Sequence, residues 1–180
     1  MRILLLCEGK NEEVLLNLLL DSNSLCITRD NLIGRRVYPV RQLSNPIIKS
    51  ELIHYGQPVT IYRVGDKQND KLIIPKELKN IVYTDKIYKY CTKPELEILL
   101  ILNENLIKEY DKVKSSQSPK TFAKKYIKYN GKKYDQSSEF LSIYYKGTRV
   151  ENLIKNITDY KKYKKHNKDE LYLYDLLKKS

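Results

Sequence analysis

An apolar run that stops abruptly on an acid opens the chain and most constrains its fold. Residues 3–7 are all apolar, Glu8 and Gly9 end the run, and apolar residues at helical spacing follow over residues 14–19. A short, continuously apolar run is typical of a parallel strand buried on both faces. A strand that enters a helix through a tight Glu-Gly turn carries Glu8 at its carboxyl end, where open α/β sheets bind their ligands.

Strand-like and helix-like segments alternate through the first half of the chain. Pro39 suggests an edge position for one of the strands, Asn45-Pro46 starts a helix, and Thr92 with Glu95 forms a capping-box pattern. The alternation is typical of a parallel sheet with helices on its faces. We therefore predict an α/β fold with a four-stranded, mainly parallel sheet. The expected strands are residues 2–7, 35–41, 58–64 and 81–90, and the expected helices are residues 11–20, 46–55 and 94–110.

Composition changes after a Ser-rich connector at residues 113–119, beyond which Lys and Tyr dominate. We expect an α/β domain over residues 1–111 and a basic helical extension over residues 112–180, packed on or beside it. The helices expected in the extension are residues 119–129, 138–145, 150–160 and 168–179.

The charge balance makes nucleic acid the default partner. Lys and Arg number 34 against 22 Asp and Glu, which gives a formal net charge of +12. A Lys-rich background from AT-rich codons also explains part of this excess. Lysines neutralise phosphates and interleaved tyrosines can stack on unpaired bases, but lysines also solvate helices while tyrosines face a core. The candidate nucleic-acid-binding residues are Arg35, Arg36, Arg63, Lys124, Lys125, Lys132 and Lys133.

The cysteines and the apolar segments suggest a cytoplasmic protein. Cys7, Cys26 and Cys91 are odd in number and lack metal-ligand spacing, so reduced thiols are expected and a disulfide scaffold is not. The run at residues 3–7 is too short for a secretory signal. No apolar segment reaches the length of a membrane span, so no membrane partner is expected.

Acidic residues fall at the ends of the predicted elements. They are Glu8 after the first strand, Asp66 and Asp70 after the third, and Glu95 and Glu97 at the helix that follows the fourth. Parallel strands bring their carboxyl ends to one edge, so these carboxylates can converge on Mg²⁺ or Mn²⁺. Lys10 and Arg63 are their expected phosphate-neutralising neighbours. Each acid, taken alone, also has a purely structural explanation, such as a position in a solvated turn or at a helix cap.

The first and third strands together resemble the TOPRIM family, the catalytic domain of topoisomerases, bacterial primases and OLD-type nucleases. Glu8-Gly9 is similar to the first motif of that family, and Asp66 to the first aspartate of its Asp-x-Asp motif. The sequence departs from the second motif, because Asp70 follows Asp66 by four positions and not two. The resemblance covers residues 1–110.

The resemblance implies a Mg²⁺-dependent nuclease acting on DNA or RNA. Glu8, Asp66 and Lys10 would be catalytic, with Glu8 a metal ligand or general acid/base, and Glu95 or Glu97 would be an auxiliary ligand. Stand-alone TOPRIM proteins of this size resemble components of bacterial anti-phage defence. Two other readings stay open: a nucleic-acid-binding module without catalysis, and a sensor or toxin subunit controlled by a partner ATPase. A second copy of the chain is the other protein partner expected.

Overall fold

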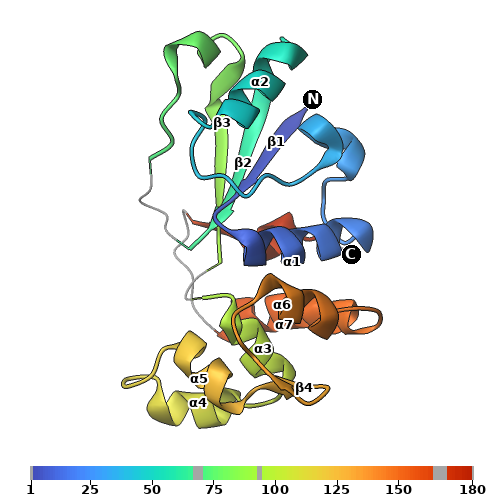
Figure 1. Ribbon diagram of the computed structural model, residues 1–180, viewed down its shortest axis with the longest axis vertical. Helices are drawn as coiled ribbons and strands as arrows, with labels where there is room; N and C mark the ends of the chain where they lie inside the picture. The colour runs from blue at the N-terminus through green and yellow to red at the C-terminus, as the bar shows by residue number, and fades with distance from the viewer. Residues whose placement is uncertain (1, 67–70, 93–94, 164–169, 180) are drawn as a thin grey trace.

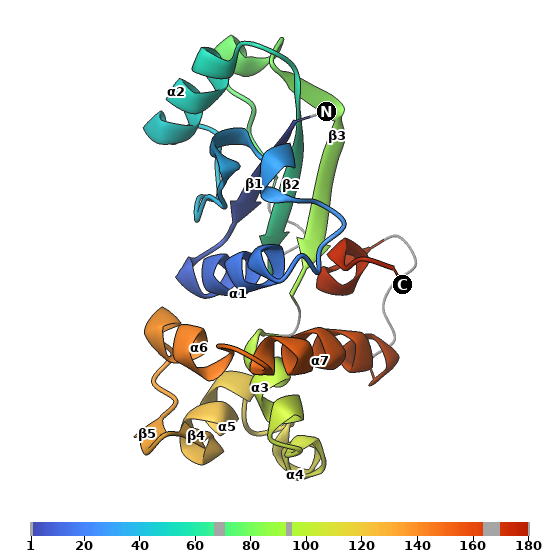
Figure 2. The ribbon, with the colours of Figure 1, turned by 90° about the vertical axis from the view of Figure 1, so that its right-hand side faces the viewer.

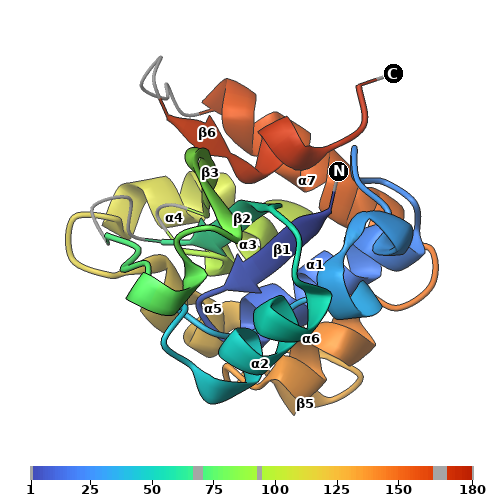
Figure 3. The same cartoon turned by 90° about the horizontal axis from the view of Figure 1, so that it is seen from above.

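The structure is a computed structural model that describes residues 2–66, 71–92, 95–163 and 170–179 (Figure 1). It confirms the α/β class and the four-stranded parallel sheet. The sheet has the order β1 (Ile3–Cys7), β2 (Val59–Gly65), β3 (Val82–Cys91) and β6 (Leu171–Tyr172), and every pairing is parallel. Figure 3 shows the four strands side by side.

The first strand and its helix form as the sequence predicts. All five residues of β1 are buried, and α1 (Lys10–Asp21) follows it with Glu12 and Glu13 in its first turn. Carboxylates at this end of a helix interact favourably with its dipole. The pairing of Cys7 with Val64 then sets the carboxyl ends of β1 and β2 beside each other.

The helix between β1 and β2 also confirms its sequence signals. α2 (Pro46–Tyr55) begins at Asn45, whose side chain accepts hydrogen bonds from the backbone N–H groups of Ile47 and Ile48. It ends at Gly56, which has the left-handed backbone typical of a helix terminus.

Residues 35–41, predicted to form a strand, do not form one. The short turns η1 (Arg29–Asn31) and η2 (Ile33–Arg35) come first, with positive φ at Gly34 and Arg35. The chain then touches the sheet at an isolated bridge between Tyr38 and Leu6. Pro39 has no N–H to continue the ladder, so the segment passes along the β1 edge without joining it.

The fourth strand comes from the other end of the chain. β6 pairs Leu171 and Tyr172 with Tyr90 and Cys91 of β3, and η4 (Leu173–Leu176) follows it. The helix predicted for residues 168–179 is therefore wrong over its described part, residues 170–179. Pairing with the end of β3 overrides the local pattern there, as tertiary contacts often do.

The helix predicted for residues 94–110 is broken in two. α3 (Glu97–Asn103) and α4 (Ile107–Val113) are separated at Asn105, which has a φ of 57°. The predicted capping box at residues 92–95 does not cap α3, since Glu95 accepts a hydrogen bond from the Lys120 backbone instead. α3 begins after Leu96, an apolar residue.

The rest of the extension is mostly helical, as expected. A hairpin replaces the end of the helix predicted for residues 119–129, because α5 stops at Tyr126. The elements that follow α4 are α5 (Pro119–Tyr126), β4 (Lys128–Tyr129), β5 (Lys132–Lys133), α6 (Ser138–Tyr144) and α7 (Arg149–Tyr163). A short turn, η3 (Lys76–Leu78), precedes β3 in the first half of the chain.

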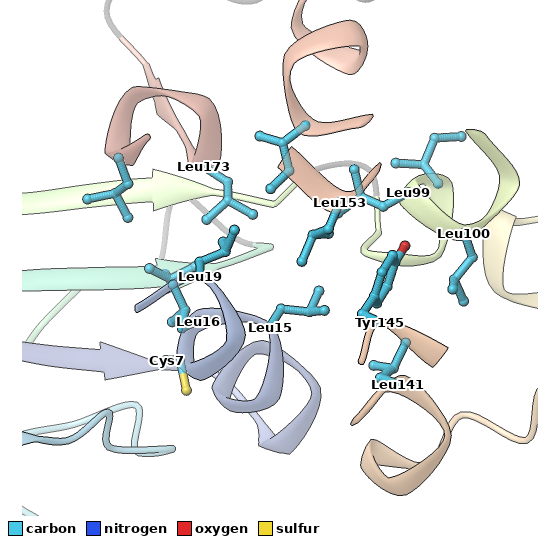
Figure 4. Packing of buried hydrophobic residues seen from close by; sticks show 14 of the residues in the cluster. Cys7, Leu15, Leu16, Leu19, Leu99, Leu100, Leu141, Tyr145, Leu153 and Leu173 are labelled. Atoms are coloured by element: carbon cyan, nitrogen blue, oxygen red, sulfur yellow. The ribbon is translucent and has the colours of Figure 1, made fainter. Parts of the chain in front are cut away.

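Two apolar clusters hold these elements together. The smaller packs α2 against one face of the sheet through residues such as Ile48, Leu52 and Ile61. The larger joins the other face to α1 and to the helices beyond the strand ends (Figures 1 and 2). Figure 4 shows Leu16 of α1 and Leu153 of α7 in this larger core. One buried core thus spans the boundary expected between residues 111 and 112.

The helices can be tested for their ability to span a membrane. Within the described ranges, no helix combines the length and the apolar composition needed to cross a bilayer.

Candidate functional site

Glu8 and Asp66 meet at the carboxyl ends of β1 and β2. The backbone N–H of Asp66 donates a hydrogen bond to Glu8 Oε2 over 3.0 Å, and the N–H of Glu8 donates to the carbonyl of Val64 over 3.1 Å. Gly65 allows this approach, because a Cβ atom there would lie 2.8 Å from Glu8 Oε2. The parallel pairing of the two strands therefore brings together the two acids that the sequence placed at strand ends.

Burial and mutual proximity set the charge state of this pair of acids. Burial, followed by the Asp66 side chain, raises the pKa of Glu8 above its ordinary value. Asp66 Oδ1 is buried and has no hydrogen-bond partner within the described chain. One cation does reach the pair: Arg41 Nη2 lies 2.6 Å from Glu8 Oε1. Glu8 is thus partly neutralised, while a buried oxygen of Asp66 accepts no hydrogen bond from the residues that the structure describes.

The pair lines a polar hollow of about 360 Å³ between the strand ends and the helices beyond them. We call it the carboxylate hollow. Five acids line it together with three cations, so its described lining is acidic. The acids are Glu8, Glu12, Asp66, Glu95 and Glu97, and the cations are Lys10, Arg41 and Lys120.

Glu12 is a site residue that the sequence analysis did not identify. It lies in the first turn of α1 and lines the carboxylate hollow. Burial is the largest cause of its raised pKa, and the charges of Asp66 and Glu97 raise it further. The available signal was the sequence position of Glu12, four residues after Glu8 and just beyond the turn that leads from the strand into the helix.

Glu95 and Glu97 line the hollow, and each also accepts a hydrogen bond from a neighbouring part of the chain. Glu97 is buried and accepts a hydrogen bond from the Tyr134 hydroxyl over 2.8 Å. Burial, then the Glu97 charge, raises the pKa of Tyr134, so the phenol stays protonated as the donor. Glu95 accepts from the Lys120 N–H at the start of α5 over 2.9 Å.

The five acids line the hollow, but in the described residues they do not converge on a single position that an ion could occupy. In the part of the chain that the structure describes, no group of three or more His, Cys, Asp and Glu side chains is arranged to hold a metal ion. Asp70, the predicted third ligand, lies outside the described residues. Glu8 and Asp66 are the acids in direct contact, and a Mg²⁺ site remains a prediction built on them.

The chain was compared with protein-family models, curated proteins and solved structures. None of them matches it. The TOPRIM resemblance therefore stays a prediction from two motifs.

The basic candidates divide into two groups. Arg35 pairs with Asp30 and Arg36 with Glu51, at 2.9 Å each, and neither arginine is among the described residues that line the hollow. The four predicted lysines are instead exposed on α5 and on the β4–β5 hairpin. Lys120 at the start of α5 lines the hollow, so this basic surface begins at the acidic site. The exposed lysines are Lys124, Lys125, Lys132 and Lys133.

Two predicted phosphate neighbours lie beside the acids. Lys10 is exposed at the hollow and pairs with Glu13 over 2.7 Å. Arg63 donates from Nη2 to the carbonyl of Arg41 over 3.1 Å, on the side of Glu8 where Arg41 reaches it.

Proposed function

We propose that this chain is a nuclease that hydrolyses phosphodiester bonds of DNA or RNA with Mg²⁺ or Mn²⁺. The observation that carries the proposal is the contact between Glu8 and Asp66. Two carboxylates from adjacent strand ends lie together, one with a raised pKa and the other with a buried oxygen that has no hydrogen-bond partner among the described residues. A hard divalent cation would satisfy both, because Mg²⁺ and Mn²⁺ prefer oxygen ligands.

Glu8 and Asp66 would hold the ion, and Glu12 is the nearest additional acid along α1. When bound, the ion would polarise the phosphodiester and lower the pKa of a water molecule. Glu8 is also suited to general acid/base catalysis, because its raised pKa moves it toward neutral pH. Lys10 and Lys120 line the same hollow and would neutralise the phosphate charge.

The exposed lysines support nucleic acid as the substrate. The segment from Lys120 to Lys133 contains six lysines, all exposed and none accompanied by an acid within the segment. Tyr126 in this segment is 49% exposed, with its ring centroid 4.5 Å from that of Phe122 and 5.1 Å from the Lys125 ammonium. Partly exposed tyrosines among lysines are typical of surfaces that bind single strands. This surface would bind the strand whose phosphodiester enters the carboxylate hollow.

A second candidate is a nucleic-acid-binding module without catalysis. The ion pair between Arg41 and Glu8 favours it, because the guanidinium already neutralises one oxygen that a metal ion would use. We also propose a role in anti-phage defence. In that role a partner ATPase would control the chain, or two copies of the chain would act as a homodimer. The three free thiols are compatible with the cytoplasmic location proposed with it.

A cleavage assay separates the two candidates. Plasmid, single-stranded DNA and tRNA are incubated with the wild type, Glu8→Gln and Asp66→Asn in Mg²⁺, Mn²⁺ or EDTA. We expect cleavage by the wild type with metal only, and a loss of about 100-fold or more in each variant. Glu109→Gln, which changes an exposed acid on α4, should cleave like the wild type. Equal cleavage by Glu8→Gln, or none by any protein, would contradict the nuclease proposal.

A further inference from the structure

A second opening lies beside the carboxylate hollow at the carboxyl ends of β1, β2 and β3. Its cationic lining residues are Arg41, Arg63 and Lys89, and we call it the cationic pocket. Glu8 is the acid of the described lining, and the other lining residues are uncharged. The described lining thus combines three positive side chains with one negative one.

The sheet itself sets two of these cations side by side. Arg63 of β2 and Lys89 of β3 are directly paired in the parallel ladder, so their side chains leave the same face of the sheet. Neighbouring strands are about 4.8 Å apart, which keeps the two cationic side chains close to each other. Two cations held side by side at the strand ends can contact one anion together.

Arg41 joins the cationic pocket to the acidic site. Its carbonyl accepts a hydrogen bond from Arg63 over 3.1 Å, and its guanidinium lies 2.6 Å from Glu8 Oε1. Arg41 and Glu8 line both openings. An anion in the cationic pocket would therefore lie next to the carboxylates of Glu8 and Asp66.

The size of the cationic pocket limits what can enter. It has about 30 Å³ of free space, against about 360 Å³ for the carboxylate hollow. A phosphoryl group could place an oxygen or two in such a space and keep its remaining atoms at the opening, whereas a planar nucleobase could not enter it. Guanidinium groups match the oxygens of a phosphate in pairs, and an ammonium adds a point charge.

We propose that the cationic pocket binds one phosphoryl group of a nucleic-acid strand, adjacent to the phosphodiester at Glu8 and Asp66. The proposal rests on the proposed function in taking a nucleic-acid strand as the carrier of that group. An internal phosphodiester and a terminal monophosphate share this chemistry. Both place a phosphate one step along the strand from the scissile bond.

The test measures binding without cleavage. Fluorescence anisotropy in EDTA follows a labelled 12-nucleotide single strand bearing a 5′-phosphate or a 5′-hydroxyl, with the wild type, Arg63→Gln and Lys89→Gln. We expect each variant to weaken binding about 3- to 10-fold and to lower the slope of log Kd against log salt by about 1. Lys108→Gln, on an exposed position of α4, should change neither quantity.

The two oligonucleotides distinguish the sources of the phosphate. Tighter binding of the 5′-phosphorylated strand, lost in both variants, would assign the pocket to a terminal phosphate. Equal binding of both strands, weakened equally by the variants, would assign it to an internal phosphodiester. Wild-type affinity and salt slope in Arg63→Gln and Lys89→Gln would overturn the proposal.

Thermal unfolding shows whether each variant is folded. It also tests phosphate binding independently of nuclease activity. Inorganic phosphate should raise the Tm of the wild type above its value in chloride of equal ionic strength. That increase should vanish in Lys89→Gln and persist in Asp66→Asn, whose cleavage is expected to be lost. An equal increase in Lys89→Gln, or none in the wild type, would also overturn the proposal.

Discussion

At the residue scale, the account depends on how two glutamates respond to burial. Glu8 directly follows β1 and Glu12 lies in the first turn of α1, and burial is the largest cause of the raised pKa of each. A raised carboxyl pKa means that the folded chain binds the proton more tightly than the unfolded chain. The folded state therefore loses stability as pH rises from the ordinary glutamate value of 4.5 through the raised values.

This predicts a measurable change in Glu12→Gln. The variant cannot ionise at this position, so the fall in its Tm between pH 4 and pH 8 should be shallower than in the wild type. Differential scanning calorimetry across that range checks it, with Glu109→Gln as the control for removing an exposed acid. Parallel curves for wild type and Glu12→Gln would show that Glu12 titrates normally in the folded chain.

At the element scale, local signals explain the ends of some helices but not of others. Asn45-Pro46 and Gly56 bound α2 as predicted, because each of these residues acts through backbone groups within a few positions. The break between α3 and α4 carries a weaker signal, since Asn105 adopts a left-handed backbone without the glycine that usually marks one. The periodic leucines on either side therefore predicted one continuous helix.

Substitutions at Asn105 test this explanation of the break. Asn105→Ala should lower the free energy of unfolding by about 1 kcal/mol, because a Cβ-bearing residue without a local hydrogen-bonding side chain pays more in this conformation. Asn105→Gly should be close to neutral or stabilising, since glycine adopts positive φ freely. Urea denaturation measures both, and an equal loss in the two variants would point to a side-chain role for Asn105 instead.

The hydrogen bonds at the start of α5 give a second prediction at this scale. Ser118 Oγ accepts from the Thr121 N–H, and Glu95 accepts from the Lys120 N–H. Ser118→Ala should lower the free energy of unfolding by about 1 kcal/mol. Thr158→Ala, which removes a hydroxyl bonded within α7, controls for loss of a hydroxyl that caps no helix. A Ser118→Ala chain as stable as the wild type would mean that Glu95 suffices as the cap.

At the scale of the whole molecule, distant parts of the chain complete what the sequence predicted locally. The sequence predicted β1, α1, α2, β2 and β3, and it placed Glu8 and Asp66 at one sheet edge from topology alone. It could not predict β6, because two residues carry little periodicity and their partners, Tyr90 and Cys91, each lie 81 positions earlier in the chain. The contacts of Arg41 with Glu8 and of Tyr134 with Glu97 could not be predicted either, because packing between distant parts of the chain creates them.

The larger core predicts that the sheet and the helices beyond it unfold together. Leu153 of α7 is fully buried in the cluster that includes Leu16 of α1. Leu153→Ala should lower the free energy of unfolding by about 2–5 kcal/mol. Ile53→Ala, at a position that is 56% exposed, should cost much less.

Hydrogen exchange checks the same prediction element by element. Amides of β1 and β2 should lose protection by the same factor as amides of α3 and α7 in Leu153→Ala, because one cooperative unit exposes them all. Loss of protection confined to α3 and α7 would show two independent folding units instead.

Metal binding by Glu8 and Asp66 is the claim on which the proposed function depends. Electron paramagnetic resonance of Mn²⁺, titrated into the wild type, Glu8→Gln and Asp66→Asn at pH 7.5, measures it most directly. We predict saturable binding by the wild type, weakened about 10-fold or more in each variant and unchanged in Glu109→Gln. Absence of saturable Mn²⁺ binding by the wild type, or equal affinity in Glu8→Gln, would contradict the account.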